Sequence, residues 1–202
     1  MRRATLCVLS ACAVLSAQGG RLDSAGFASD PKGVLASCAE RLEALKPKDG
    51  KYLAEAGRFQ LLAGHARKGE DLLRFAEMMD PKDREVLRLV GLAYLKAGRC
   101  KDALAAYDKV LLRDGGPRKG IAHAGADLAE AGLTREAERF MDAYALLENN
   151  DWEAFIGFGR AHLQGGARRT AAAWFQRALV LKPAEERAYL EIGRAFADPR
   201  PR

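Results

Sequence analysis

The histidines and cysteines are the residues of this chain whose side chains could act as bases, nucleophiles or metal ligands. His65, His123 and His162 stand far apart, with no Cys, His or carboxylate at metal-ligand spacing. The sequence contains no His-Glu-x-x-His, no Gly-x-Ser-x-Gly and no phosphate-binding loop that ends in Gly-Lys-Ser/Thr. We therefore expect a protein that is not an enzyme, with no catalytic residue, no metal and no cofactor.

Two cysteines, Cys38 and Cys100, lie outside the first twenty residues. The repeat described below would place them in different layers of the array, too far apart for a disulfide. We expect both to be free thiols with structural roles.

The basic character of the chain is concentrated at its two ends. The formal net charge is +6, and Arg2, Arg3, Arg200 and Arg202 contribute most of it. The central part is nearly neutral, and no aromatic residues alternate with a basic stripe, so a nucleic-acid partner is not predicted.

The first residues of the chain are typical of a secretory signal. Met1, Arg2 and Arg3 form a short basic start, and an apolar stretch follows from Ala4 to Ala17. A run of about fourteen apolar residues is short for a bilayer span, and a small residue at its end suits signal peptidase cleavage. We expect a signal segment over residues 1–17 and a linker over 18–30, and therefore a periplasmic or cell-envelope location.

A second interpretation of this segment stays open. Residues 9–12 read Leu-Ser-Ala-Cys, which resembles a bacterial lipobox and would make Cys12 a lipidated first residue. The apolar run before Cys12 is very short for a lipoprotein signal, and it continues afterwards over residues 13–15.

Glycine recurs every 34 residues along most of the chain. One series is Gly57, Gly91, Gly125, Gly159 and Gly193, and a second follows seven residues later at Gly64, Gly98, Gly132 and Gly166. Self-similarity at a fixed period of this length indicates one structural unit copied in tandem.

Each unit has the apolar pattern of two helices. Apolar residues at positions −4, −1 and +3 from the first glycine share one helix face. A second apolar stripe at +12, +16 and +19 predicts a second amphipathic helix. The second glycine falls between the two stripes, where a left-handed residue ends a helix. Pro47, Pro81 and Pro183 mark boundaries between units.

This order of apolar, glycine, small and proline positions resembles the tetratricopeptide repeat. The resemblance covers residues 50–197 and implies an all-α, right-handed α-solenoid of tandem 34-residue helix-turn-helix repeats. It gives four units (50–83, 84–117, 118–151 and 152–185), followed by a C-terminal capping helix and basic tail over 186–202. Upstream, Asp30 and Pro31 supply an N-cap and a first-turn proline for an N-terminal capping helix within 31–49.

The units depart from the family pattern at a few positions. Gln60 and His162 replace the usual tyrosine, and Tyr144 replaces a small residue, so we expect looser helix packing in the third unit. Each glycine inside a helix costs about 1 kcal/mol relative to alanine. The resemblance implies that the first glycine series is kept because the two helices of a unit approach closely there.

The first helix of each unit lines the inner curve of tetratricopeptide folds, so the resemblance implies a concave groove. The residues that we expect to contact a partner are basic or large apolar side chains at inward-facing positions: Arg58, Leu61, Leu62, Arg88, Leu92, Leu95, Lys119, Ile156, Arg160, Leu163, Leu190 and Arg194. An apolar floor with surplus arginine suits an acidic or amphipathic peptide, because arginine pairs with carboxylates. The alternative is that these leucines serve packing and the charges form a solvated face.

We therefore predict a non-enzymatic adaptor or scaffold that binds a protein or peptide partner, with membrane contact only if Cys12 is lipidated. Alternatives from the sequence are a lipid-anchored assembly factor of an envelope or secretion complex, an accessory domain of an enzyme, and an unrecognised hydrolase. Self-association is a further possibility, because the last helix ends the array with an unpaired apolar edge of Tyr189, Ile192 and Phe196.

Overall fold

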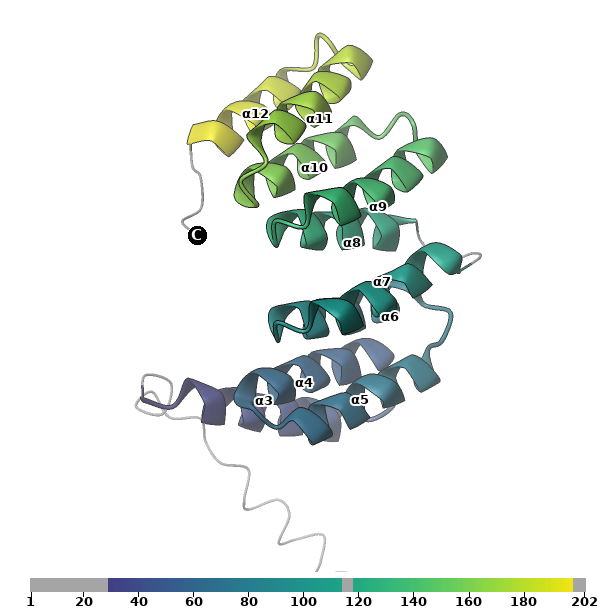
Figure 1. Ribbon diagram of the computed structural model, residues 1–202, viewed down its shortest axis with the longest axis vertical. Helices are drawn as coiled ribbons and strands as arrows, with labels where there is room; N and C mark the ends of the chain where they lie inside the picture. Colours follow the sequence, from purple (N-terminus) through teal and green to yellow (C-terminus); the bar gives the residue numbers. More distant parts are fainter. Residues whose placement is uncertain (1–28, 114–117, 198–202) are drawn as a thin grey trace, which may run out of the picture.

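The computed structural model describes residues 29–113 and 118–197, and in these ranges it contains ten α-helices and no strand. The helices are α3 (Pro31–Leu45), α4 (Gly50–Ala63), α5 (Ala66–Met79), α6 (Arg84–Lys96), α7 (Cys100–Leu112), α8 (Lys119–Glu130), α9 (Thr134–Leu147), α10 (Trp152–Gln164), α11 (Arg168–Leu181) and α12 (Glu186–Ala197). Four helix pairs, α4–α5 to α10–α11, follow one another along the long axis (Figure 1). The prediction of an all-α solenoid of tandem helix pairs is confirmed. The expected signal segment, Cys12 and the basic tail lie outside the described residues.

Aspartate N-caps fix where the first helices begin. Asp49 accepts a hydrogen bond from the backbone N–H of Lys51 at 3.0 Å, and Asp83 accepts one from the backbone N–H of Glu85 at 2.8 Å. Asp151 caps α10 in the same way. These side chains satisfy donors that the first helical turn leaves unpaired, so the repeated aspartates set the start of three units.

The second glycine series ends the first helices. Gly64, Gly98, Gly132 and Gly166 have φ angles of 95°, 75°, 79° and 87°. This left-handed region is open to glycine without a Cβ penalty. The expected left-handed turn between the two helices of each unit is therefore present in all four.

The first glycine series lies where the two helices of a unit meet. A Cβ atom at Gly57 would stand 2.7 Å from Leu73 Cδ2, and one at Gly91 would stand 2.7 Å from the Tyr107 ring. Gly125 and Gly159 are similarly close to Met141 and Phe175. Gly193 differs, because a Cβ there would meet nothing within 4 Å. The inference of close approach is therefore right for four glycines and wrong for Gly193, since the described residues contain no second helix of the same unit that could pair with α12.

The expected looser packing of the third unit amounts to a small difference in clearance from the 2.7 Å found at Gly57 and Gly91. A Cβ at Gly125 would lie 2.9 Å from Met141 Cγ, so α8 and α9 approach closely. The bulk of Tyr144 is accommodated between units: its ring lies edge-on to Phe158 of the next unit, with centroids 5.8 Å apart.

The helices form two layers, and the helices of one layer are packed more closely than those of the other. Each first helix packs on its own second helix and directly on the first helices of neighbouring units, whereas successive second helices hardly touch in the described ranges. The array therefore curves toward the first helices, which form its inner layer. At the N-terminal end α3 packs along α4, with Ala39 fully buried.

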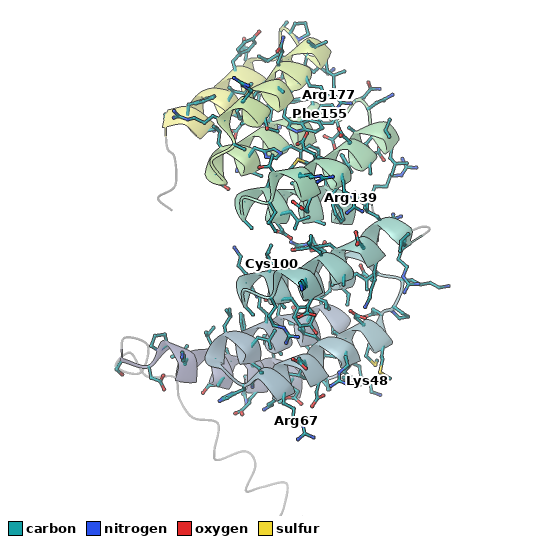
Figure 2. All side chains as sticks on the ribbon, viewed as in Figure 1. Lys48, Arg67, Cys100, Arg139, Phe155 and Arg177 are labelled. Atoms are coloured by element: carbon teal, nitrogen blue, oxygen red, sulfur yellow. The ribbon has the colours of Figure 1, made fainter. Side chains whose placement is uncertain are left out.

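Ion pairs connect the second helices of successive units across the outer layer. The pairs are Lys109–Glu77 at 2.6 Å, Arg139–Asp108 at 3.2 Å and Arg177–Asp142 at 4.0 Å. Arg177 also lies 4.9 Å from the centre of the Phe155 ring, and the two are labelled side by side in Figure 2. None of the helices in the described ranges is both long and apolar enough to span a bilayer.

Candidate partner-binding site

A cavity of about 410 Å³ opens between the first helices of units 3 and 4, α8 and α10. Its floor consists of small residues, namely Ala122 and Ala126 on α8 and Ala154 and Gly157 on α10. A Cβ atom at Gly157 would meet no atom within 4 Å, so the space in front of this glycine is open. The remaining lining residues are Lys119, His123, Glu130, Tyr144, Asp151, Glu153, Phe158, Arg160, Ala161 and Gln164.

The position of the cavity follows from two alanines in the repeat. At the positions of Ala122 and Ala126, the preceding unit has Arg88 and Leu92. Long side chains at these positions cover the inner surface in unit 2, and methyl groups leave it open in unit 3. The cavity is thus a local property of units 3 and 4 and not a general feature of the repeat.

A fixed acidic group closes one side of the cavity. Asp151 accepts a hydrogen bond from the Tyr144 hydroxyl at 2.6 Å and from the backbone N–H of Ala154 at 3.0 Å. Burial and the bond to Asp151 raise the pKa of Tyr144 well above its usual value, so the hydroxyl stays a donor at physiological pH. This pair holds the start of α10 in place and provides a rigid wall.

The polar and charged residues on the rest of the rim differ in whether their side chains form ion pairs. Glu153 binds Arg187 at 2.7 Å, and Arg160 lies 3.5 Å from Glu191. The side chains of Lys119, Glu130 and Gln164 make no hydrogen bond or ion pair with another described residue. The free groups offer donors and an acceptor beside a small apolar floor. That combination suits one apolar side chain of a peptide together with its polar backbone.

Two residues of the predicted contact set, Lys119 and Arg160, line this cavity. The other predicted arginines are engaged by neighbouring acids. Arg58 pairs with Glu55 at 2.5 Å, Arg194 pairs with Glu191 at 2.9 Å, and Arg88 is largely buried between Glu85 and Asp127. The basic surplus expected in the groove is therefore mostly neutralised within the array.

The predicted apolar contacts mostly serve packing. Ile156 is 3% exposed, and the half-buried leucines Leu61, Leu92, Leu95 and Leu163 pack against the two apolar cores. Leu62 is half-buried as well, and Leu190 is 51% exposed on α12. The structure brings these residues onto the inner layer without gathering them around one space.

Sequence reasoning missed the small residues that shape the cavity and the acid beside it. Large side chains are the partner contacts predicted from the sequence, whereas Ala122, Ala126 and Gly157 form the cavity because they have little side-chain volume. A comparison of side-chain size between equivalent positions of successive units would have found them.

Gln60 and His162, the two polar residues at the position of the usual tyrosine, are fully buried and form side-chain hydrogen bonds. His162 Nε2 lies 2.8 Å from Glu138 Oε1, and the indole N–H of Trp174 donates to the same oxygen at 2.9 Å. Burial lowers the pKa of His162, so its ring is neutral at physiological pH. Gln60 Oε1 lies 2.7 Å from His65 Nδ1. No group of His, Cys, Asp and Glu in the described ranges is arranged to hold a metal ion.

No protein-family model matches the chain. A search of curated proteins finds no match either. Among solved structures, the chain is similar to the crystal structure of MamA, with 16% identity, 78% of this chain and 88% of that chain covered, and a TM-score of 0.45. It is also similar to YrrB, described as a TPR protein with an unusual peptide-binding site, with 15% identity, coverage of 89% and 95%, and a TM-score of 0.43. These likenesses concern the helical-repeat fold.

Proposed function

We propose that this protein is a non-enzymatic adaptor that binds an extended peptide or a protein segment in the cavity between α8 and α10. The observation that supports the proposal is the open floor at Gly157, bordered by Lys119, Glu130 and Gln164, which lack partners among the described residues. One apolar side chain of the partner enters the cavity, and the polar groups bind its backbone and neighbouring side chains. An acidic side chain next to the anchor suits Lys119 and Arg160.

Rigid walls explain how such a small site could bind. The Tyr144–Asp151 hydrogen bond and the helix pairs on both sides fix the cavity before a partner arrives. A preformed site loses little conformational entropy on binding, so a modest contact area yields measurable affinity. Adaptor activity in this form needs no chemical step.

The sharpest test fills the cavity without damaging the fold. Gly157→Leu places a side chain where a Cβ meets nothing within 4 Å, and it replaces a helical glycine. Gly193→Leu is the matched control, because Gly193 is also helical and open but lies on α12, away from the cavity. Peptides selected from a random display library on the parent protein are then tested on both variants.

We expect Gly157→Leu to abolish binding of the selected peptides and Gly193→Leu to retain it. Equal binding by both variants would show that the cavity is not the binding site. Failure of the parent to select any peptide, together with failure to crosslink a protein in the native host, would reject the adaptor function itself.

We further propose that the adaptor is exported and acts in the cell envelope. The basic start and the apolar stretch from Ala4 to Ala17 support this location. Mass spectrometry of the protein isolated from its host distinguishes the outcomes. A mature chain that begins after Ala17 supports signal peptidase cleavage, lipidated Cys12 supports the anchored alternative, and an intact Met1 in a soluble cell fraction rejects export.

A further inference from the structure

The first helices α4, α6, α8 and α10 each bury one apolar face under a second helix, but the same face of α12 is open. Tyr189 is 54% exposed, whereas the residues at its position in the four units are at most 2% exposed, namely Leu53, Leu87, Ile121 and Phe155. Phe196 is 50% exposed on the same side of the helix. We call Tyr189, Ile192, Gly193 and Phe196 the open face of α12, which lies next to α11 at the end of the array (Figure 1).

The side of α11 that would adjoin a further second helix is uncharged. In the outer layer, acids at three positions of a second helix bind cations of the next one or of its N-cap, in the pairs Glu70–Arg99, Glu77–Lys109, Asp108–Arg139 and Asp142–Arg177. The equivalent positions of α11 hold Ala172, Gln176 and Leu179. A terminal unit that faces water normally has a polar outer side. Here a single polar residue, Gln176, stands between apolar ones, so this side suits contact with an apolar helix.

The charges of α11 and α12 are placed elsewhere. Arg168 and Arg169 lie in the first turn of α11, and Arg177 pairs backward with α9. On α12, Arg187 binds Glu153 of α10, and Glu191 binds Arg160 and Arg194. The open face is therefore not part of a charged surface.

Gly193 has no packing role among the described residues. A Cβ atom there would meet nothing within 4 Å, and glycine inside a helix is less favourable than alanine. The equivalent Gly57 and Gly91 are required because a second helix crosses them, with a side-chain atom 2.7 Å from where their Cβ would stand. A glycine at position 193 is what a helix that crosses α12 would require.

The four helix pairs show which kind of helix fits such a face. Each second helix has a small residue at the crossing, which lets the backbones approach, and a large apolar residue four positions later, which covers the glycine of the first helix. These pairs of residues are Gly69 and Leu73, Ala103 and Tyr107, Ala137 and Met141, and Ala171 and Phe175. All eight are buried.

A second copy of the chain offers no free helix of this kind in the described ranges. Its helices α5, α7, α9 and α11 are each packed on their own first helix. A second α12 would present Gly193 at the place where the pattern has a large apolar residue. The pattern therefore favours a helix that comes from a different protein.

We propose that the open face of α12 binds an amphipathic helix of a partner protein, which takes the place of a fifth second helix. The partner helix has a small residue opposite Gly193, a large apolar residue four positions later, and few charges where it meets α11. This is recognition of an amphipathic helix by an apolar surface. The site is separate from the cavity between α8 and α10 and does not depend on the function proposed for that cavity.

The open face is held in shape before a partner binds. The Tyr189 hydroxyl donates to the carbonyl oxygen of Pro183 at 2.9 Å, and the Phe196 ring lies 5.7 Å from the Phe175 ring between centroids. Fixed rings lose little conformational entropy on binding.

A helical peptide with the sequence of residues 166–183 is the probe, because it carries Ala171 and Phe175 at the required spacing. Isolated helices of this length are marginal in water. A lactam bridge between positions 172 and 176, both exposed in the array, keeps the peptide helical. Fluorescence anisotropy of the labelled peptide measures binding to the full chain. We expect the parent to bind it and Gly193→Leu to bind it at least tenfold more weakly.

Matched variants separate loss of the site from loss of the fold. Gly157→Leu makes the same change at another open helical glycine, in the cavity, and should bind the probe as the parent does. Gly193→Ala should weaken binding threefold or more although alanine favours the helix, and thermal denaturation should show this variant to be at least as stable as the parent. A probe with Ala171→Leu, equally helical by circular dichroism, should not bind.

Equal binding of the probe by the parent and Gly193→Leu would overturn the proposal, and so would absence of binding by the parent. Peptides selected for the cavity should respond to Gly157→Leu and not to Gly193→Leu, so failure of one site is distinguished from failure of the other. If sedimentation shows a dimer of the parent that Gly193→Leu dissociates, a second copy covers the open face and the assignment to a different protein is wrong.

Discussion

Two successive junctions of the array both contain an edge-on ring contact, Tyr107–Phe140 and Tyr144–Phe158, and the first also contains a largely buried ion pair. Between units 2 and 3, Arg88 on α6 reaches Asp127 on α8 with a Nη1–Oδ2 distance of 2.7 Å, and the Tyr107 hydroxyl donates to the same oxygen at 3.3 Å. Between units 3 and 4 the ring contact lies beside the hydrogen bonds of His162 and Trp174 with Glu138. The Phe158 ring of unit 4 lies edge-on to Tyr144 of unit 3, with centroids 5.8 Å apart, and edge-on to Trp174 of its own unit at 5.1 Å.

The difference shows how one repeat can serve two purposes. In the charged junction, the Arg88 side chain covers the inner surface. This junction requires both Arg88 and Asp127, because a buried charge without its partner costs several kcal/mol of stability. The aromatic junction joins the units through the Tyr144 and Phe158 rings, which border the cavity and tolerate other apolar shapes. The inner positions of unit 3 are therefore free to be alanine, and the cavity opens there.

The largest effect should come from breaking the charged junction. Arg88→Met leaves Asp127 with no cationic partner among the described residues in a site where burial already raises its pKa. We expect the free energy of unfolding to fall by about 3–5 kcal/mol, as for other buried ion pairs that lose one partner. Urea denaturation at neutral pH measures the change.

Two variants sharpen this result. Arg74→Met removes an exposed arginine paired with Asp71 at 2.5 Å, and it should cost at most about 1 kcal/mol. The double variant Arg88→Met/Asp127→Asn should recover part of the loss, because no buried charge is left unpaired. A loss for Arg88→Met no larger than for Arg74→Met would contradict the description of this junction as charge-dependent.

The aromatic junction should tolerate an apolar change much better. Phe158→Leu keeps an apolar side chain in the core and removes the edge-on ring contacts, which are worth about 1 kcal/mol beyond the buried area. With the apolar area and volume that the shorter side chain leaves unfilled, we expect a total loss of unfolding free energy in urea of about 1–2 kcal/mol. A loss as large as that of Arg88→Met would mean that both junctions require specific partners, and the comparison would fail.

The junctions should also differ in their response to acid. Burial lowers the pKa of His162 below its ordinary value near 6.5, so the unfolded chain binds a proton more readily than the folded one. The stability that depends on neutral His162 is complete above that ordinary value and is lost as the pH falls toward the lowered pKa. In the charged junction, the hydrogen bond from His123 and the proximity of Arg88 lower the pKa of Glu85 to about 2, so the contribution of Glu85 persists to far lower pH, whereas burial raises the pKa of Asp127.

His162→Phe tests this difference. Phe196 occupies the equivalent position of α12, so a phenyl ring suits the repeat, and it does not titrate. We expect the unfolding free energy of the variant to change less between neutral pH and pH 5 than that of the parent. Parallel pH profiles of the two proteins would show that His162 does not govern this range, and an NMR titration of its ring would report its pKa directly.

Sequence reasoning succeeded where a property repeats and failed where it depends on neighbouring units. The glycine period predicts the helix pairs, because a residue without a Cβ atom is needed where the two helices of a unit cross, as at Gly57 and Gly91. The ion pair of Arg88 with Asp127 joins residues 39 apart on different helices, and nothing in either unit alone reveals it. The cavity at Ala126 likewise depends on what the adjacent units leave unfilled.

A surface ion pair gives the smallest expected effect and a reference for the comparison. Lys109 Nζ lies 2.6 Å from Glu77 Oε2 across units 1 and 2, with 45% of the lysine side chain exposed. Lys109→Ala should cost at most about 1 kcal/mol, because exposed pairs are screened by water. Raising the ionic strength should reduce the difference further. Arg88→Met should keep most of its effect at high salt, since a pair whose side chains are only 14% and 16% exposed is screened much less. Equal salt sensitivity of the two variants would place Arg88 among the surface pairs and remove the distinction between the junctions.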